Sequence, residues 1–397
     1  MLCSFLISAD YSIIRPVSNA TFITSFGTEY FPYAWLLTVP LNILLVSWYN
    51  KFLPRWGCFK TFLAVASAIA LFNFFCALFL KEINWLPFVF YVWKEVYIML
   101  MFQQLWSVIH ATIAYSHAKY LYGMIFGVGA CGAVLGSLLP GFFAVKLGSE
   151  TLLFATLPLY ALLSLCYAQA LRKTSEGLAF KLDDEKTKNS TQAFMHGFTL
   201  IRSSRFLVFI LLIVIFMQLS STLIDYQFNS FLQQEIPDKD LRTQYTGRIL
   251  GIVHVISLCL QFVGSFLLVH FLGMRRSHFF VPLSLCLNAV AFLFMPTFAL
   301  ITSSYIAVKS FDFSLFGVIK EIMYIPLKKD EKFRAKAFID VFAHRTSKAG
   351  ASFLILGLQY LSLPHLQLTL SWIGLILFSL WCLLVHRMLK NELVVNA

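Results

Sequence analysis

Two Lys-Glu pairs occur inside apolar stretches, where ionised side chains are candidates for binding a charged ligand. Lys94 and Glu95 lie in an apolar run from about Leu86 to Ile113, and Lys320 and Glu321 lie in a second run. A charge at the bilayer centre costs at least ~2.5–3.5 kcal/mol on insertion scales, so it persists where it faces a partner or a water-filled cavity. We expect both pairs to face one solute pathway, with the lysines meeting an anionic group and the glutamates holding them when no solute is bound.

Further charges share the second run. Lys309 and Asp312 are i, i+3 neighbours on a predicted helix, and Lys320 returns to nearly the face of Lys309 eleven residues later. One interpretation is a charged stripe that lines the pathway. The alternative is an internal Lys309–Asp312 pair that only fixes packing.

Polar groups in two other apolar segments could complete the site. Arg15 precedes Pro16 and could bind phosphate or carboxylate through its planar guanidinium, or could extend to the membrane surface instead. Asp225 and Gln227 lie in the pseudo-symmetric counterpart of the Arg15 segment, and Asp225 could pair with Arg15. Asp225, Glu95, Asp312 and Glu321 are the candidate proton carriers, because desolvation favours a neutral carboxyl.

A cytoplasmic gate is predicted at the start of a later apolar segment. Asp340 and Arg345 begin that segment, and Lys336 precedes it. We expect these three residues to form a gate or latch and not a solute site.

The composition that positions these residues is that of a membrane protein. Hydrophobic residues make up 59% of the chain and charged residues 13%, against about 25% charged in a typical globular domain. Successive apolar stretches of roughly 20 residues indicate transmembrane helices. The eight cysteines show no metal-ligand spacing, so neither a metal nor a cofactor is expected.

Twelve spans are predicted, and the first is the least apolar because Asp10 and Arg15 fall within it. The spans are Met1–Thr21, Tyr33–Tyr49, Thr61–Leu80, Leu86–Ile113, Leu121–Val145, Thr151–Leu171, Phe206–Phe228, Ile249–Leu272, Phe279–Met295, Ala299–Leu327, Phe338–Leu361 and Leu366–Leu384. One set of loops holds 20 Lys and Arg residues and the opposite set holds 5, which predicts that both termini are cytoplasmic. The net charge of +12 therefore reflects topology, and no nucleic-acid partner is expected.

The only long polar segment divides the spans into two sets of six. We expect an N-terminal half at 1–171, a cytoplasmic linker at 172–205 and a C-terminal half at 206–397. In the linker, Phe194, Phe198 and Ile201 are spaced as on an amphipathic surface helix, with a plain loop as the alternative. The Lys-Glu pairs lie six spans apart, which favours a duplicated unit with a site between pseudo-symmetric halves, as in major facilitator transporters.

Glycines in the predicted fifth span have small-x-x-x-small spacings, including Gly132 and Gly136. Such spacings allow two helices to approach closely. No phosphate-binding G-x-x-x-x-G-K-[ST] motif is present, so we do not expect the chain to hydrolyse ATP to drive transport.

Three stretches resemble the non-mitochondrial ATP/ADP translocase family and its broader relatives. They are the segment from Lys320 through Asp340 and Arg345 to Gly350, the segment Ser221–Phe228, and the turn Ala114–Lys119 with the glycine-rich span after it. The resemblance implies a twelve-helix, major-facilitator-like carrier whose substrate is an anionic metabolite, with nucleotides such as ATP and ADP leading. Other small metabolites remain alternatives.

Two other functions fit these residues less well than transport. A membrane enzyme lacks a catalytic constellation, since no H-E-x-x-H or G-x-S-x-G motif occurs and the histidines are scattered. A non-transporting receptor or scaffold would leave the intramembrane charges without a role. We expect a monomeric secondary transporter in the bacterial inner membrane.

Overall fold

The computed structural model describes most of the chain as α-helix. The described residues are 1–112, 115–174, 201–202, 204–264, 270, 273–324, 336–362 and 365–390. The predicted linker helix with Phe194 and Phe198 lies outside them, as does most of segment 172–205. No strand occurs in the described residues, so the predicted all-α fold class is confirmed in this coarse form.

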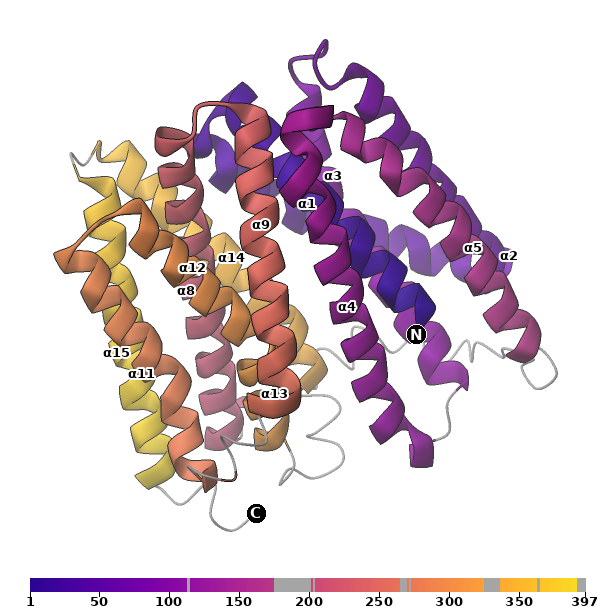
Figure 1. The fold of residues 1–397 in the computed structure, drawn as a ribbon. Helices are drawn as coiled ribbons and strands as arrows, with labels where there is room; N and C mark the ends of the chain where they lie inside the picture. Colours follow the sequence, from indigo (N-terminus) through magenta and orange to yellow (C-terminus); the bar gives the residue numbers. More distant parts are fainter. Residues whose placement is uncertain are drawn as a thin grey trace. The chain divides into compact units, whose positions relative to one another are not determined.

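Figure 1 shows the described helices along the chain. They are α1 (Leu2–Phe26), η1 (Thr28–Tyr30), α2 (Phe31–Phe79), α3 (Leu86–Thr112), α4 (Tyr115–Leu147), η2 (Thr151–Ala155), α5 (Thr156–Thr174), α8 (Arg205–Glu235), α9 (Lys239–Cys259), η3 (Leu260–Gly264), α11 (Gly273–Phe294), α12 (Phe298–Phe313), α13 (Leu315–Met323), α14 (Lys336–Tyr360) and α15 (Leu366–Lys390).

Seven helices in the described ranges are long and apolar enough to cross a membrane. They run over Thr28–Leu53, Arg55–Phe79, Met124–Leu147, Thr151–Leu171, Arg205–Glu235, Lys239–Phe262 and Leu366–Met388. The integral, multi-pass character predicted from composition is therefore supported by helix length and apolarity together.

Four predicted spans differ in the structure. The predicted first span ends at Thr21, but α1 continues to Phe26 and stops at Gly27, whose φ of 82° is a left-handed conformation that glycine adopts readily. The predicted tenth span was a single helix, but Ser314 has φ −130° and ψ −91° and separates α12 from α13. The second and third predicted spans form α2, which bends at Gly57 with φ 75°.

The chain divides into two compact units. Unit 1 comprises Met1–Leu182 and Gln233–Val255, and unit 2 comprises Asp183–Leu232 and Ile256–Ala397. The first 17 residues of α9 thus cluster with helices of the first part of the chain. Each unit is described below by itself.

Unit 1 is built around α1, which contacts α4, α3 and α5. The contact with α4 is close because two glycines face the α1 backbone. A Cβ atom on Gly132 would lie 2.2 Å from the Phe5 carbonyl oxygen, and one on Gly136 would lie 2.3 Å from that of Ala9. The close approach predicted from the Gly132/Gly136 spacing is confirmed.

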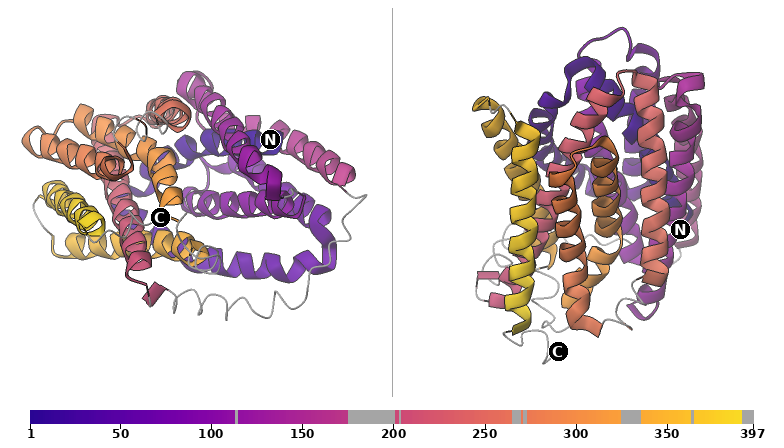
Figure 2. Two further views of the ribbon diagram at one scale, coloured as in Figure 1. Left: turned by 90° about the horizontal axis from the view of Figure 1, so that it is seen from below. Right: turned by 60° about the vertical axis from the view of Figure 1, so that its left-hand side comes forward.

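In unit 2, α11 and α15 lie side by side along most of their length (Figures 1 and 2). The helices α12 and α13 contact each other and α11. Tyr305 on α12 stacks on Phe228 of α8, with ring centroids 4.2 Å apart. Unit 2 therefore joins helices on both sides of α9 in the sequence.

Candidate functional site

Lys94 is the most deeply buried basic side chain of the predicted site, with 1% of its surface exposed. Its Nζ donates to Asn19 Oδ1 of α1 at 2.6 Å and lies 3.5 Å from Glu95 Oε1. The ammonium also lies 4.0 Å from the centroid of the Tyr91 ring, within the range of a cation–π contact. One helical turn of α3 thus supplies the cation, the carboxylate and the aromatic face.

Neighbouring groups fix the orientation of this turn. The indole Nε1 of Trp35 on α2 donates to the Tyr91 hydroxyl at 2.7 Å. The Tyr91 ring contacts Phe22 of α1, with centroids 4.8 Å apart. Because Lys94 and Glu95 are close enough for an ion pair, the glutamate stabilises the buried ammonium, and the cost of holding this charge in an apolar segment falls.

A second buried lysine lies in unit 2. Lys309 on α12 donates to Ser221 Oγ of α8 at 3.0 Å, and its Nζ lies 3.8 Å from Asp225 Oδ2. The side chain of Lys309 is 11% exposed and that of Asp225 20%. The Tyr305 ring centroid lies 5.8 Å from the ammonium.

The two lysines share the same chemistry. Each lies in a helix that begins a few residues after the preceding helix ends, and each has a tyrosine ring three or four positions earlier. Each also donates a hydrogen bond to a polar group on a second helix of its own unit. The sequence prediction matched Lys94 with Lys320. Lys309 has contacts that correspond to those of Lys94, and Lys320 lies past the break at Ser314, in the last turn of α13. The match between Lys94 and Lys320 stays a prediction.

Asp312 and Asp225 each contact a residue of another helix in unit 2. Asp312 Oδ1 accepts from Gln218 Nε2 of α8 at 3.0 Å. Asp225, for which a pairing with Arg15 was considered, pairs with Lys309 inside unit 2. The carboxylates of this region therefore connect α8 with α12.

Gln227 takes part in a different contact from Asp225. Its Nε2 donates to Ser371 Oγ at 2.8 Å and to the Gln367 carbonyl oxygen at 2.9 Å, both on α15. These bonds direct the Gln227 amide to α15, and residues two apart lie on nearly opposite faces of a helix. A role of Gln227 in solute binding beside Asp225 stays a prediction.

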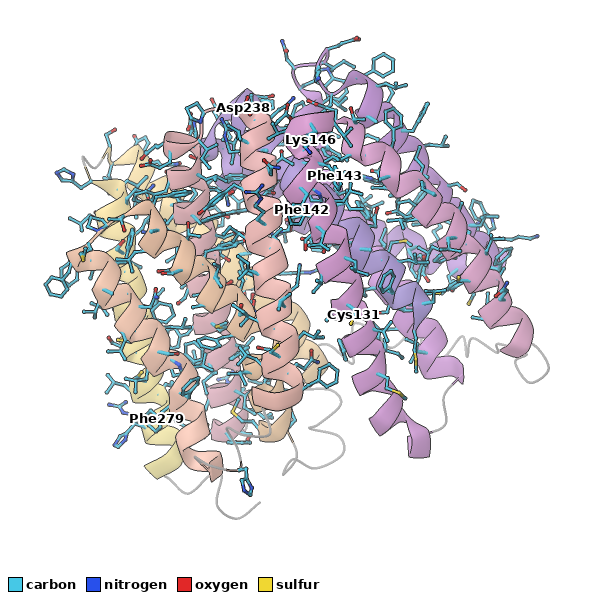
Figure 3. The ribbon with its side chains drawn as sticks, viewed as in Figure 1. Cys131, Phe142, Phe143, Lys146, Asp238 and Phe279 are labelled. Atoms are coloured by element: carbon cyan, nitrogen blue, oxygen red, sulfur yellow. The ribbon has the colours of Figure 1, made fainter. Side chains whose placement is uncertain are left out.

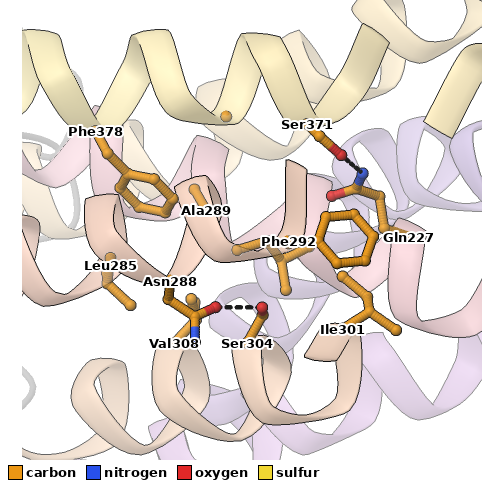
Figure 4. Close-up of a pocket in the computed structure, with 12 residues that line it drawn as sticks. Gln227, Leu285, Asn288, Ala289, Phe292, Ile301, Ser304, Val308, Ser371 and Phe378 are labelled. Atoms are coloured by element: carbon orange, nitrogen blue, oxygen red, sulfur yellow. Dashed lines mark hydrogen bonds between the residues drawn. The ribbon is translucent and has the colours of Figure 1, made fainter. Parts of the chain in front are cut away.

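Gln227 lines a small pocket among α8, α11, α12 and α15 (Figure 4). Two other polar side chains that line the pocket pair with each other, since Asn288 accepts a hydrogen bond from Ser304. The apolar lining of the pocket includes Phe292 and Phe378. The cavity volume of about 20 Å³ is room for roughly one water molecule. This pocket is too small for a metabolite.

Arg15 lies in the middle of α1, is buried and is 8% exposed. On the same helix, Ser12 Oγ lies 3.5 Å from Nε2 of His254 on α9. All three residues belong to unit 1. Sequence reasoning singled out Arg15 but left out His254, whose neighbours come from a distant segment of the chain.

The predicted gate is only partly within the described structure. The side chains of Lys336 and Asp340 lie outside it, as does that of Glu321, whereas Arg345 is half-buried on α14. The gate therefore stays a prediction.

A polar cluster that the sequence analysis missed joins the α4–η2 turn to the start of α9. Glu150, 5% exposed, pairs with Lys239 and lies 3.6 Å from Lys81 Nζ. Ser149 donates to Asp240 Oδ1 through its backbone N–H at 2.9 Å and its hydroxyl at 2.5 Å. We call these residues the α4–α9 latch, and Figure 3 labels Asp238 at the same end of α9.

These features define a class of protein. The described helices form an α-helical, multi-pass membrane fold that matches solved transporters: the nucleoside transporter NupG, with a TM-score of 0.62 at 12% identity over 98% of both chains, and the POT family transporter PepTSo, with a TM-score of 0.59 at 11% identity over 97% of this chain and 98% of that one. At these identities the likeness concerns the fold.

Sequence comparison then gives the particular relationship. The TLC ATP/ADP transporter family profile matches residues 297–392. ADP,ATP carrier protein 1 of Chlamydia trachomatis is 25% identical over 433 residues, which cover 90% of this chain and 80% of that protein. The corresponding protein of Rickettsia bellii is 22% identical over 300 residues, covering 67% and 60%. The resemblance to the ATP/ADP translocase family and its relatives is confirmed.

Proposed function

We propose that this chain is a secondary transporter of an anionic metabolite, working by alternating access, with a nucleotide such as ATP or ADP as the leading substrate. One observation carries the proposal: Lys94 and Lys309 are buried in apolar helices, and each is held by a polar partner on another helix of its unit. A phosphate or carboxylate could replace those partners. The ADP,ATP carrier relatives support the choice of a nucleotide.

The site residues fall into two groups under this proposal. Lys94, Lys309 and Arg15 supply positive charge to the anion, and Lys320 extends that charge along its helix. Glu95, Asp225 and Asp312, together with Glu321, hold the cations in the absence of substrate. Displacement of these internal contacts by the anion would link binding to the change between open states.

The layout that we propose has twelve spans in two six-helix halves, at 1–171 and 206–397, joined by a cytoplasmic linker at 172–205. Both termini would then be cytoplasmic, and Lys336, Asp340 and Arg345 would form the cytoplasmic gate. The α4–α9 latch would close the end of the transport pathway opposite to this gate. We place the protein as a monomer in a bacterial inner membrane.

Transport would run on exchange or on an ion gradient. The decisive experiment is uptake of labelled ATP by proteoliposomes preloaded with ADP, compared with empty vesicles and with vesicles loaded with other nucleotides, cofactors and amino acids. We expect stimulation by internal nucleotide. Absence of uptake of every anion in the panel by purified, correctly folded protein would refute the proposal.

A further inference from the structure

Asp10 is an acidic side chain in the interior of unit 1 that the proposed substrate site does not use. It lies on α1 and is 3% exposed. Its Oδ2 accepts two hydroxyl hydrogen bonds, from Tyr97 of α3 at 2.9 Å and from Tyr160 of α5 at 2.5 Å. Its Oδ1 is buried and has no hydrogen-bond partner among the described residues.

Among the described residues, no positively charged side chain forms an ion pair with Asp10 that would balance an ionised carboxylate. Within the described part of the chain, its hydrogen bonds come only from the two tyrosines, and no ion pair involves it. Lys94 lies one turn before Tyr97 but donates to Asn19. Arg15 lies about 140° around the helix from Asp10, and α4 meets this part of α1 with Gly136 against the Ala9 backbone.

A buried carboxylate without a counter-charge becomes neutral by taking up a proton. The geometry fits a neutral acid, because both hydroxyl donors converge on one oxygen, which then acts as the carbonyl oxygen. The other oxygen, Oδ1, is left to carry the proton. An ionised group would be expected to distribute its donors over both oxygens, since both would carry negative charge.

We propose that Asp10 is a proton-binding site, occupied at neutral pH, and that its proton is the one that couples transport to a proton gradient. The coupling part rests on the proposed function. The helices α1 and α3 meet at two polar contacts, Asp10 with Tyr97 and Asn19 with Lys94. A displacement of α1 relative to α3 on substrate binding would therefore alter the proton site as well.

The protonation is tested without any transport measurement. Infrared spectra of the full-length protein in detergent at neutral pH should contain the carbonyl stretch of a protonated carboxyl, and Asp10→Asn should remove it. Asp238→Asn, which changes an exposed carboxylate at the start of α9, should leave the band in place. A spectrum at neutral pH without a band that depends on Asp10 would overturn the proposal.

Labelling with an apolar carbodiimide gives a second readout, because such reagents add to protonated carboxyl groups in apolar surroundings. Mass spectrometry of the wild-type protein should find the adduct on the peptide that contains Asp10, with little on the peptide that contains Asp238. Labelling restricted to exposed acids would contradict an occupied proton site. Asp10→Asn keeps an acceptor oxygen for both tyrosines, so we expect it to fold.

The coupling is tested in proteoliposomes. An imposed pH gradient should stimulate nucleotide uptake by the wild-type protein at least several-fold, and Asp10→Asn should lose that stimulation. A variant that keeps it would refute the coupling even where the infrared band is present. If the wild-type protein transports no nucleotide, the choice of a nucleotide as substrate fails and the coupling is tested with the anion that is taken up, whereas the infrared and labelling results still decide the state of Asp10.

Discussion

Replacing Lys94 by glutamine should separate a binding lysine from a structural clamp. The substitution removes the positive charge and leaves two groups without it, Asn19 at 2.6 Å and Glu95 at 3.5 Å. Because Lys94 is 1% exposed, solvent cannot replace the lost contact. We therefore expect the substitution to lower both the affinity for the anion and the stability of the protein, and the two losses can be compared.

The expected magnitudes follow from these contacts. A hydrogen bond to a charged group contributes ~1.5–3 kcal/mol, so loss of one such bond to an anion should weaken binding by about 10- to 150-fold. The free energy of unfolding should fall by a further ~1–3 kcal/mol, since a buried acceptor loses its donor. Glu95 has a 19% exposed side chain, so water reduces the cost of losing its ion pair with Lys94.

The assay is equilibrium binding of labelled ATP to monodisperse protein in detergent, with a melting temperature for each variant. The double variant Lys94→Gln with Glu95→Gln is the matched control, because it also removes the Glu95 carboxylate that has lost its ion pair with Lys94. We expect the double variant to regain part of the lost stability but little of the affinity. Wild-type affinity in a well-folded Lys94→Gln protein would show that Lys94 does not contact substrate.

Three further predictions concern other parts of the molecule. Lys309→Gln should also weaken anion binding about 10- to 150-fold, and an unchanged dissociation constant would remove it from the site. Glu150→Gln should destabilise the α4–α9 latch by about 1 kcal/mol and raise hydrogen exchange in the first turns of α9; unchanged exchange there would contradict a latch. Gly132→Val should lower the melting temperature, because its Cβ would overlap the α1 backbone at 2.2 Å. Gly357→Ala is its control, since no atom lies within 4 Å of that Cβ, and equal stability of the two variants would refute the close-packing argument.

Much of the helical framework could be predicted from the sequence, because a bilayer demands long apolar helices whatever their contacts. The Gly132/Gly136 contact was predictable as well, since its spacing matches one turn of a helix. The ends of α1 and the break at Ser314 were not, because they depend on local backbone conformation. The sequence stays apolar across the boundary between α12 and α13, so composition does not mark this break.

The candidate site was predicted at the level of residue type and only partly at the level of contacts. The charges Lys94, Lys309 and Asp225 were all identified, because charge is rare in apolar segments. Their partners Asn19 and Ser221 were not, because an amide or a hydroxyl in such a segment is common. The sequence pattern predicts Lys320 as the counterpart of Lys94, and the structure adds that Lys309 has contacts of the same kind as Lys94.

The contacts also explain how such a chain can hold several intramembrane charges in the absence of substrate. Each buried ammonium has a carboxylate in its own unit, Glu95 for Lys94 and Asp225 for Lys309, and each carboxylate keeps about one-fifth of its side chain exposed. A fully enclosed pair would exchange its partner for an anion only at a high desolvation cost. Partial exposure of the carboxylate lets it turn to water while the lysine stays in place. Such an arrangement is stable enough to fold, and under the proposed function it would leave the lysines available to an anionic substrate.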